Sequence, residues 1–219
     1  IEARPWLRFA STQKRLKMHK FQQYYFWFLY ALLHLIWIFM TDYQKYFKRK
    51  IGEVALRKMT AYEHFSFWAA KAIYAFMFVA LPIMLIGFTK WIIGFLIITM
   101  VTGLAISIVF QLAHTVEDTD FPIPTEVSGK IESEWAIHQI NTTANFATKS
   151  KTISWLLGGL NFQIEHHLFP RISHVHYPAI SKIIKKTCGE YGVNYIEFPK
   201  MRQAILSHIH YLKRLGKLA

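Results

Sequence analysis

The chain alternates between long apolar runs and strongly basic segments. Three apolar runs stand out, and they cover residues 24–40, 67–87 and 91–113. A membrane-spanning helix needs about 20 predominantly apolar residues. The second run has 21 residues and the third has 23, so each is predicted to cross a bilayer. The first run has 17 residues and is marginal.

Lys and Arg residues flank these runs. Residues 1–23 hold six of them, residues 41–66 hold six more, and twelve lie between residue 114 and the end of the chain. Between the second and third runs there is Lys90 alone. The positive-inside rule places basic segments on the cytoplasmic side of a membrane. The second and third runs therefore predict a tight transmembrane hairpin that turns at residues 87–90.

The first run has basic residues at both of its ends. This flanking predicts that residues 24–40 form an amphipathic or re-entrant helix that lies in the membrane interface. The alternative is a third crossing, which would place two basic segments on opposite sides of the membrane. We therefore expect a cytoplasmic or interfacial segment at residues 1–66, a transmembrane hairpin at 67–113 and a cytoplasmic C-terminal region at 114–219.

The C-terminal region is predicted to be mostly helical. A loop rich in Pro, Gly and acidic residues is expected at 118–130, followed by mixed helix and loop at 131–149. An amphipathic helix is predicted at 178–189, where it starts at a proline and stops at a glycine. A basic helix is predicted at 201–215. The expected fold class is mainly α, with an integral membrane hairpin and a cytoplasmic helical cap that carries a histidine-rich metal site.

Composition supports a membrane environment. The chain of 219 residues is 53% hydrophobic and 18% charged, whereas soluble domains carry about 25% charged residues. The net charge of +13 alone would suit nucleic acid or an anionic membrane surface. Together with the apolar runs it favours membrane lipid as the partner, and we expect no nucleic acid. The single Cys188 excludes an intrachain disulfide.

The segment Gln163-Ile-Glu-His-His167 contains the strongest candidates for chemistry. Imidazole is the commonest metal ligand of proteins. Two neighbouring histidines on a helix point about 100° apart, so His166 and His167 can serve two metal ions or two positions on one. Gln163 lies three residues before His166 and shares its face. The alternative interpretation is a pair of surface histidines.

His114 lies at the end of the third run. An ionisable residue in a membrane segment is costly and is a functional candidate by default, although a histidine can also reach the interface without a function. Gln111, one turn back, could hydrogen-bond a ligand or a bound water. Together with His166 and His167, His114 would give three imidazoles near one membrane face. Such a set can bind iron, zinc or copper.

The remaining ionisable candidates are weaker. Glu117 and Glu165 are near the histidines and could be ligands or could orient them. His174 and His176 would lie on one side of an extended segment, where a structural or substrate-facing role is expected. We expect the others to be solvated or isolated: His208 and His210 in the basic helix, and His19, His34, His64 and His138 elsewhere.

The histidine pair and its surroundings resemble the membrane fatty acid desaturases. The closest resemblance is to the front-end group, which inserts a double bond between an existing one and the carboxyl end. The residues that carry the resemblance are Phe110-Gln-Leu-Ala-His-Thr-Val-Glu117, the stretches 135–139 and 142–146, Trp155-Leu-Leu-Gly-Gly-Leu-Asn-Phe-Gln-Ile-Glu-His-His-Leu-Phe-Pro170, the stretch 172–178 and, more weakly, 15–52.

The resemblance implies a centre of two non-haem iron ions at the cytoplasmic membrane face. His166 and His167 match the iron ligands of the family's third histidine box, and Gln163 matches the glutamine that replaces that box's first histidine. His114 matches an additional ligand at the end of the last membrane helix. The implied reaction uses molecular oxygen and electrons from cytochrome b5 or a ferredoxin to place a cis double bond in an acyl-CoA or acyl-lipid.

One departure from the family is large. The first two histidine boxes, of the forms HxxxH and HxxHH, do not occur at the expected place. The expectation is that the chain is a C-terminal fragment that is inactive by itself. Two alternatives are a degenerate relative and a hydroxylase or acetylenase of the same framework. A third is a transporter subunit or lipid-binding scaffold. Phe146, Trp155 and Phe162 could line an acyl channel or could simply pack between helices.

Overall fold

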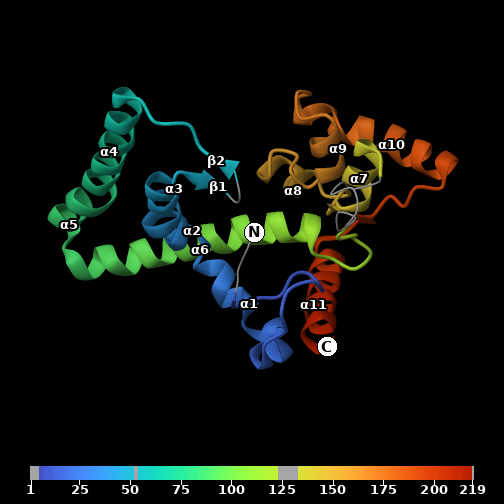
Figure 1. Ribbon diagram of the computed structural model, residues 1–219, viewed down its shortest axis with the longest axis horizontal. Helices are drawn as coiled ribbons and strands as arrows, with labels where there is room; N and C mark the ends of the chain where they lie inside the picture. Colours follow the sequence, from blue (N-terminus) through green and yellow to red (C-terminus); the bar gives the residue numbers. More distant parts are fainter. Residues whose placement is uncertain (1–4, 52–53, 123–132, 219) are drawn as a thin grey trace. The chain divides into compact units, whose positions relative to one another are not determined.

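The computed structural model describes residues 5–51, 54–122 and 133–218, and it is mainly α-helical, as predicted (Figure 1). The chain divides into two compact units. We call residues 27–107 the apolar unit, and residues 1–26 with 108–219 the histidine unit. Two helices continue from one unit into the other, α1 (Gln22–Ala31) and α6 (Phe88–His114).

The other elements fall within single units. The apolar unit contains α2 (Leu33–Ile36), the π-helical turn η2 (Trp37–Thr41), α3 (Asp42–Lys48), the antiparallel strands β1 (Lys50–Ile51) and β2 (Val54–Ala55), α4 (Ala61–Ala75), the π-helical turn η3 (Phe76–Ala80) and α5 (Leu81–Ile86). The histidine unit contains η1 (Lys17–Phe21), α7 (Trp135–Asn141), β3 (Asn145–Phe146), α8 (Lys151–Leu156), α9 (Gln163–Leu168), η4 (His174–His176), α10 (Tyr177–Tyr191), β4 (Glu197–Phe198) and α11 (Met201–Lys217).

Among the described residues, two helices are long and apolar enough to cross a membrane, at Ala61–Ile86 and Phe88–His114. The first covers the second apolar run except for its last residue, and the second contains the whole third run. With 27 residues, α6 is about 40 Å long, which exceeds the thickness of a bilayer core. Large apolar side chains on these helices are exposed, and Met84 and Leu85 are 78% and 73% exposed. Apolar surface of this extent is typical of a protein that lipid surrounds.

Pro82 shows how the first of these spans accommodates a proline. A proline has no N–H and its ring disturbs the carbonyl four residues earlier. Here the π-helical turn η3 precedes the proline, and the Phe78 carbonyl accepts a hydrogen bond of 2.8 Å from the indole N–H of Trp91. The freed carbonyl is therefore satisfied inside the protein, as a bilayer requires.

Gly87 ends α5 with a φ of +80°, and α6 begins at the next residue. The predicted turn at 87–90 is thus too long, because Phe88, Thr89 and Lys90 are already helical. A glycine in this backbone region changes the chain direction without the strain of a side chain. A second glycine matters in α6: a Cβ at Gly103 would lie 2.3 Å from the Ala31 carbonyl oxygen, so this contact with α1 needs glycine.

The first apolar run is not one straight helix. The helical stretches Lys17–Ala31 and Leu33–Lys48 meet at an angle of 54°. Such a break fits a broken span or a re-entrant segment. The choice between an interfacial helix and a third crossing therefore stays a prediction, as does the division of the chain between the two sides of a membrane.

The N-terminal segment and α11 are held together in the histidine unit. The Arg8 guanidinium donates a hydrogen bond of 2.9 Å to the Leu215 carbonyl, and the Gln22 amide donates one of 2.8 Å to the Leu212 carbonyl. Gly216 approaches so closely that a Cβ there would lie 2.2 Å from the His19 carbonyl oxygen. Two ends of the sequence thereby form one packed body.

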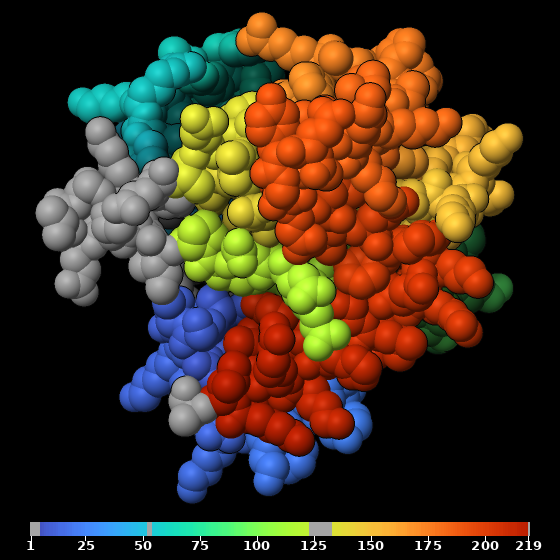
Figure 2. Space-filling view, turned by 90° about the vertical axis from the view of Figure 1, so that its right-hand side faces the viewer, coloured from blue at the N-terminus to red at the C-terminus, as the bar shows by residue number. Residues whose placement is uncertain are grey.

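The core of the histidine unit brings distant segments together. The strands β3 and β4 pair in parallel, with Asn145 opposite Glu197 and Phe146 opposite Phe198. One apolar cluster joins α6, β3 and α11 through Leu112, Phe146 and Ala204, and a second joins α9 and α10 through Ile164 and Ile184. Figure 2 shows one face of the molecule, where the C-terminal part of this unit, in orange and red, covers a large area.

The predicted helices of the C-terminal region need small corrections. Helix α10 runs on past Gly189 and ends at Tyr191, followed by Gly192, whose φ of +67° forms the left-handed cap. Helix α11 continues two residues beyond Leu215. The loop predicted at 118–130 lies partly outside the described residues, as does the start of the segment predicted at 131–149.

Candidate metal centre

His114 is the last residue of α6. Its Nδ1 lies 3.2 Å from the Thr142 carbonyl oxygen, just beyond the end of α7. A carbonyl oxygen can only accept a hydrogen bond, so this contact assigns the proton to Nδ1. The lone pair then resides on Nε2. A neutral imidazole with a free Nε2 is a metal ligand whose orientation the backbone fixes.

Helix α9 presents the predicted pair, and its His167 makes the same type of contact. The Nδ1 of His167 lies 3.0 Å from the Gln139 side-chain oxygen of α7. With Nδ1–H as donor, this contact also leaves Nε2 free for a metal. His166 lies beside Tyr177, with 3.4 Å between its Nδ1 and the phenol oxygen.

The structure brings the three imidazoles together. The ring centres of His114 and His167 are 5.1 Å apart, and those of His166 and His167 are 5.8 Å apart. Burial, reinforced by the neighbouring rings of His114 and His166, lowers the pKa of His167 to about 4. His167 is therefore neutral at pH 7, the state that metal binding requires.

The three rings do not form a complete site. Among the residues that the structure describes, no three His, Cys, Asp or Glu side chains are arranged to hold one metal ion. The donors nevertheless fit iron, because imidazole nitrogen is a common ligand of that metal. His114, His166 and His167 therefore remain candidate ligands.

Gln163 begins α9 and is 2% exposed. Its side-chain nitrogen donates a hydrogen bond to the Leu160 carbonyl, which fixes the amide within the turn that precedes the helix. Gln163 remains a candidate ligand through its amide oxygen.

Neither predicted carboxylate contacts the histidine rings of this centre. Glu165 is fully buried and accepts hydrogen bonds of 2.7 Å from Asn145 and 2.8 Å from Tyr195. Its burial raises the pKa of the carboxyl group, and the two hydrogen bonds oppose that rise. Glu117 is partly exposed, and its carboxylate lies 3.8 Å from His210.

His208 corrects a prediction, because it is 2% exposed rather than solvated. It lies on the inner face of α11, and its Nδ1–H donates a hydrogen bond of 2.6 Å to the Thr115 carbonyl. Burial lowers the pKa of His208 to about 4. Gln111 belongs to the same group of contacts, since its side-chain oxygen accepts 2.8 Å from the Thr115 hydroxyl.

His174 and His176 are exposed, and they lie in the short 3-10 helix η4 rather than in an extended segment. His174 packs against the turn before α9, because a Cβ added to Gly159 would lie 2.7 Å from the Cβ of His174. Gly159 also has a φ of +76°, so this position needs glycine for two reasons.

Three residues of this region were not singled out from the sequence for these roles. Gln139 orients His167, while Asn145 and Tyr195 hold Glu165. Each lies at least 20 positions along the chain from its partner. A buried polar group needs a partner, but that rule does not say which distant residue supplies it.

The aromatic candidates for an acyl channel separate into two kinds. Phe146 and Phe162 are buried in the core at 0% and 4% exposure, whereas Trp155 is 80% exposed. Packing therefore accounts for the first two. A cavity of about 480 Å³ instead borders His114, with Phe121, Pro122 and Thr142 in its lining.

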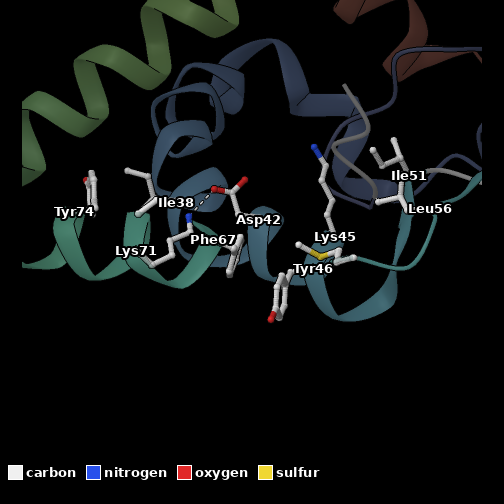
Figure 3. A pocket seen from close by; sticks show the side chains of 11 residues that line it. Ile38, Asp42, Lys45, Tyr46, Ile51, Leu56, Phe67, Lys71 and Tyr74 are labelled. Atoms are coloured by element: carbon white, nitrogen blue, oxygen red, sulfur yellow. Dashed lines mark hydrogen bonds and ion pairs between the residues drawn. The ribbon is translucent and has the colours of Figure 1, made fainter. Parts of the chain in front are cut away.

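Another cavity, of about 600 Å³, belongs to the apolar unit (Figure 3). Its walls are mainly apolar, and Ile38, Phe67 and Tyr74 contribute to them. The ion pair between Asp42 and Lys71, drawn dashed in Figure 3, lies at its edge with an N–O distance of 2.6 Å. None of the candidate metal ligands lines this cavity.

Comparison with known proteins identifies the class. The family model described as fatty acid desaturase matches residues 6–199, and the chain belongs to that family. No solved structure gives a significant match.

Three curated relatives are similar over nearly the whole chain. The acyl-lipid (8-3)-desaturase of Physcomitrium patens is 40% identical over 95% of the chain and 44% of its own length. The sn-1 linoleoyl-lipid 6-desaturase of Synechocystis is 38% identical over 96% of the chain and 59% of its own length. The enzyme of that name from Arthrospira platensis is 35% identical over 96% and 57%. The chain thus spans about half the length of these relatives.

Proposed function

We propose that the protein containing this chain is a front-end fatty acid desaturase, an oxidoreductase that places a cis double bond on the carboxyl side of an existing one. The observation that carries the proposal is the contact between the rings of His114, at the end of the apolar helix α6, and His167 on α9. This contact occurs in a chain of the desaturase family. A lipid-binding scaffold would not need two imidazoles oriented with Nε2 free.

The chain's own residues would hold and orient a metal centre of two iron ions. His114, His166 and His167 would supply nitrogen ligands, and Gln163 would contribute directly or through water. Thr142 and Gln139 hold the rings of His114 and His167 in one tautomer, so no rotation is needed when a metal binds. When bound, the iron would supply the activation of molecular oxygen with which two hydrogens are removed from adjacent methylenes.

The substrate would reach this centre along an apolar surface. The cavity beside His114 has Phe121 and Pro122 in its wall, and such groups exclude water from a bound acyl chain. The relatives named above are acyl-lipid and linoleoyl-lipid enzymes, which favours a lipid-linked acyl chain over an acyl-CoA. Membrane lipid is then both the surroundings and the substrate.

The sidedness follows from charge. The basic segments around the apolar helices favour a cytoplasmic position for the histidines. The net charge of +13 would also attract an acidic electron donor of the cytochrome b5 or ferredoxin type. Because the chain has three of the histidines that such a centre needs, we expect it to be inactive by itself.

The test is product analysis with the complete reading frame that encodes the chain. Expression in yeast fed with linoleoyl lipid should yield a fatty acid with one additional cis double bond nearer the carboxyl end. The variant His167→Ala should lose the product, and the matched variant His210→Ala, at an exposed histidine, should keep it. A hydroxylated or acetylenic product would replace the desaturase assignment, and an unchanged fatty acid profile would overturn it.

A further inference from the structure

Glu165 directly precedes the histidine pair in the sequence, and its carboxylate is hydrogen-bonded to residues outside α9. It is fully buried in the interior, together with Asn145. Both of its oxygens accept hydrogen bonds, one from the Asn145 amide nitrogen and one from the Tyr195 hydroxyl. An unpaired charge at this depth would be strongly destabilising, so these contacts are needed for the fold to retain Glu165.

Asn145 uses its amide oxygen and both hydrogens of its amide nitrogen in hydrogen bonds. Its oxygen accepts 2.9 Å from the Ile164 N–H, in the first turn of α9. Its nitrogen donates 2.7 Å to Glu165 and 2.7 Å to the Tyr195 hydroxyl. Asn145 thus caps the start of α9 from another element, because Phe162 at the N-cap position offers no side-chain cap.

The partners of Glu165 lie on rigid parts of the unit. Asn145 is in β3, whose backbone pairs with β4. Tyr195 precedes β4, and its hydroxyl also lies 2.9 Å from the Ser181 hydroxyl on α10. We call Asn145, Glu165, Ser181 and Tyr195 the Glu165 network. It connects α9 to β3, to α10 and to the segment before β4.

Helix α9 needs such support. It has six residues, and an isolated helix of that length does not form in water. The two histidines follow Glu165 directly. The orientation of the α9 backbone at Glu165 therefore sets the directions in which both imidazole rings point. We propose that Glu165 is a positioning residue, whose hydrogen bonds with Asn145 and Tyr195 fix the turn of α9 that aims His166 and His167 at the metal centre. The binding of a metal by these two histidines rests on the proposed function, but the anchoring of α9 by Glu165 does not.

Replacement by glutamine should preserve the network. In Glu165→Gln the side-chain oxygen can accept from Asn145, and the side-chain nitrogen can donate to Tyr195, whose proton can turn to Ser181. Glu165→Ala removes both contacts and leaves the Asn145 and Tyr195 donors without their acceptor. Tyr195→Phe removes one of the two contacts of Glu165, together with the contacts of the hydroxyl to Asn145 and Ser181, and serves where the alanine variant does not fold. Glu190→Ala, at an exposed carboxylate of α10, is the matched control.

Hydrogen exchange of the chain in lipid nanodiscs tests the anchoring without metal. In Glu165→Ala the amides of α9 should exchange at least about tenfold faster, while those of α11 keep their rates. Tyr195→Phe should give a smaller local increase, and Glu165→Gln and Glu190→Ala should match the parent. Unchanged exchange in α9, or equal acceleration in α9, α10 and α11, overturns the proposal.

Iron content then separates this inference from the proposed function. In the complete reading frame, Glu165→Ala should lower the iron content of the folded protein, because loss of a residue that orients metal ligands weakens metal affinity by about tenfold to a hundredfold. Glu165→Gln should restore the iron content. If the parent holds no iron while α9 responds as expected, the proposed function fails and the anchoring stands. If iron is present but indifferent to Glu165→Ala, the positioning role fails.

Discussion

The apolar unit and the histidine unit place their polar groups in opposite ways. In the apolar unit, Met84 and Leu85 are exposed, and the ion pair Asp42–Lys71 borders an open cavity (Figure 3). In the histidine unit, Glu165 and Asn145 have no exposed surface. The difference indicates two solvents. The exposed apolar helices of the apolar unit suit lipid as their surroundings. The histidine unit has a packed core that encloses a polar network, which suits a protein surface in water.

The two units also satisfy freed backbone groups differently. In the apolar unit, the Phe78 carbonyl that Pro82 leaves free is bonded by Trp91. In the histidine unit, the Ile164 N–H is bonded by the side chain of Asn145. A large aromatic donor suits a lipid-facing helix, whereas a small amide fits a core that has several polar neighbours.

The largest expected contrast concerns the loss of a large side chain. Phe146→Ala removes a fully buried ring from the core of the histidine unit and should cost about 3–5 kcal/mol of unfolding free energy. Phe78→Ala, at 58% exposure, should cost far less in detergent. Chemical denaturation of both variants measures the difference. Equal losses would show that Phe78 is packed in a core rather than covered by lipid.

A charge on an exposed position should distinguish lipid from water. Ile98 on α6 and Ile183 on α10 are each 66% exposed. Ile98→Lys should disfavour membrane insertion by about 2.5–3.5 kcal/mol, while Ile183→Lys should have almost no effect. Glycosylation mapping in microsomes gives the inserted fraction. Tolerance of lysine at Ile98 would contradict the assignment of α6 as a span.

Acid should weaken the histidine unit through His208. Its pKa is lowered to about 4 by burial, against 6.5 in an unfolded chain, so the unfolded state binds the proton more readily. The stability is therefore fully present above about pH 6.5 and is lost as the pH falls toward 4, by at most about 3 kcal/mol. His208→Asn should reduce the loss of unfolding free energy between pH 6.5 and pH 4, as chemical denaturation at a series of pH values would measure it. His210→Asn, at an exposed histidine, should leave that loss unchanged. His167 would retain part of the slope, because its pKa is lowered as well.

The smallest expected effect is at the surface ion pair of the apolar unit. The side chains of Lys71 and Asp42 are 19% and 49% exposed. Asp42→Asn should cost less than about 1 kcal/mol, because solvent screens the charges. A double-mutant cycle with Lys71→Met measures their coupling. A coupling as large as that of a fully buried pair would mean that the cavity beside them is closed.

Hydrophobic periodicity and length carried most of the correct predictions. The two spans and α11 follow from them because these elements are long and regular. The meeting of His114 with His166 and His167 was expected from the resemblance, and the structure brings the three rings together. Periodicity could also have found the burial of His208, since Ala204, Ser207, His208, Tyr211 and Leu215 follow one face of α11. The basic composition of that segment outweighed this signal.

Other features could not be predicted from the sequence. Gly189 and Gly192 are equally plausible ends for α10, and the backbone's positive φ at Gly192 decides between them. The partnership of Glu165 with Asn145 and Tyr195 spans 20 and 30 positions of sequence. Such contacts arise from the packing of β3, α9 and β4, so no local pattern indicates them.

The central claim is that the histidine unit contributes ligands to an iron centre. The most direct test is the iron content of the protein purified from the complete reading frame, with His167→Ala and His210→Ala measured beside the parent. We predict two iron ions per parent chain, a clear loss of iron in His167→Ala and no loss in His210→Ala. Iron that stays bound in His167→Ala at the parent level would contradict the claim.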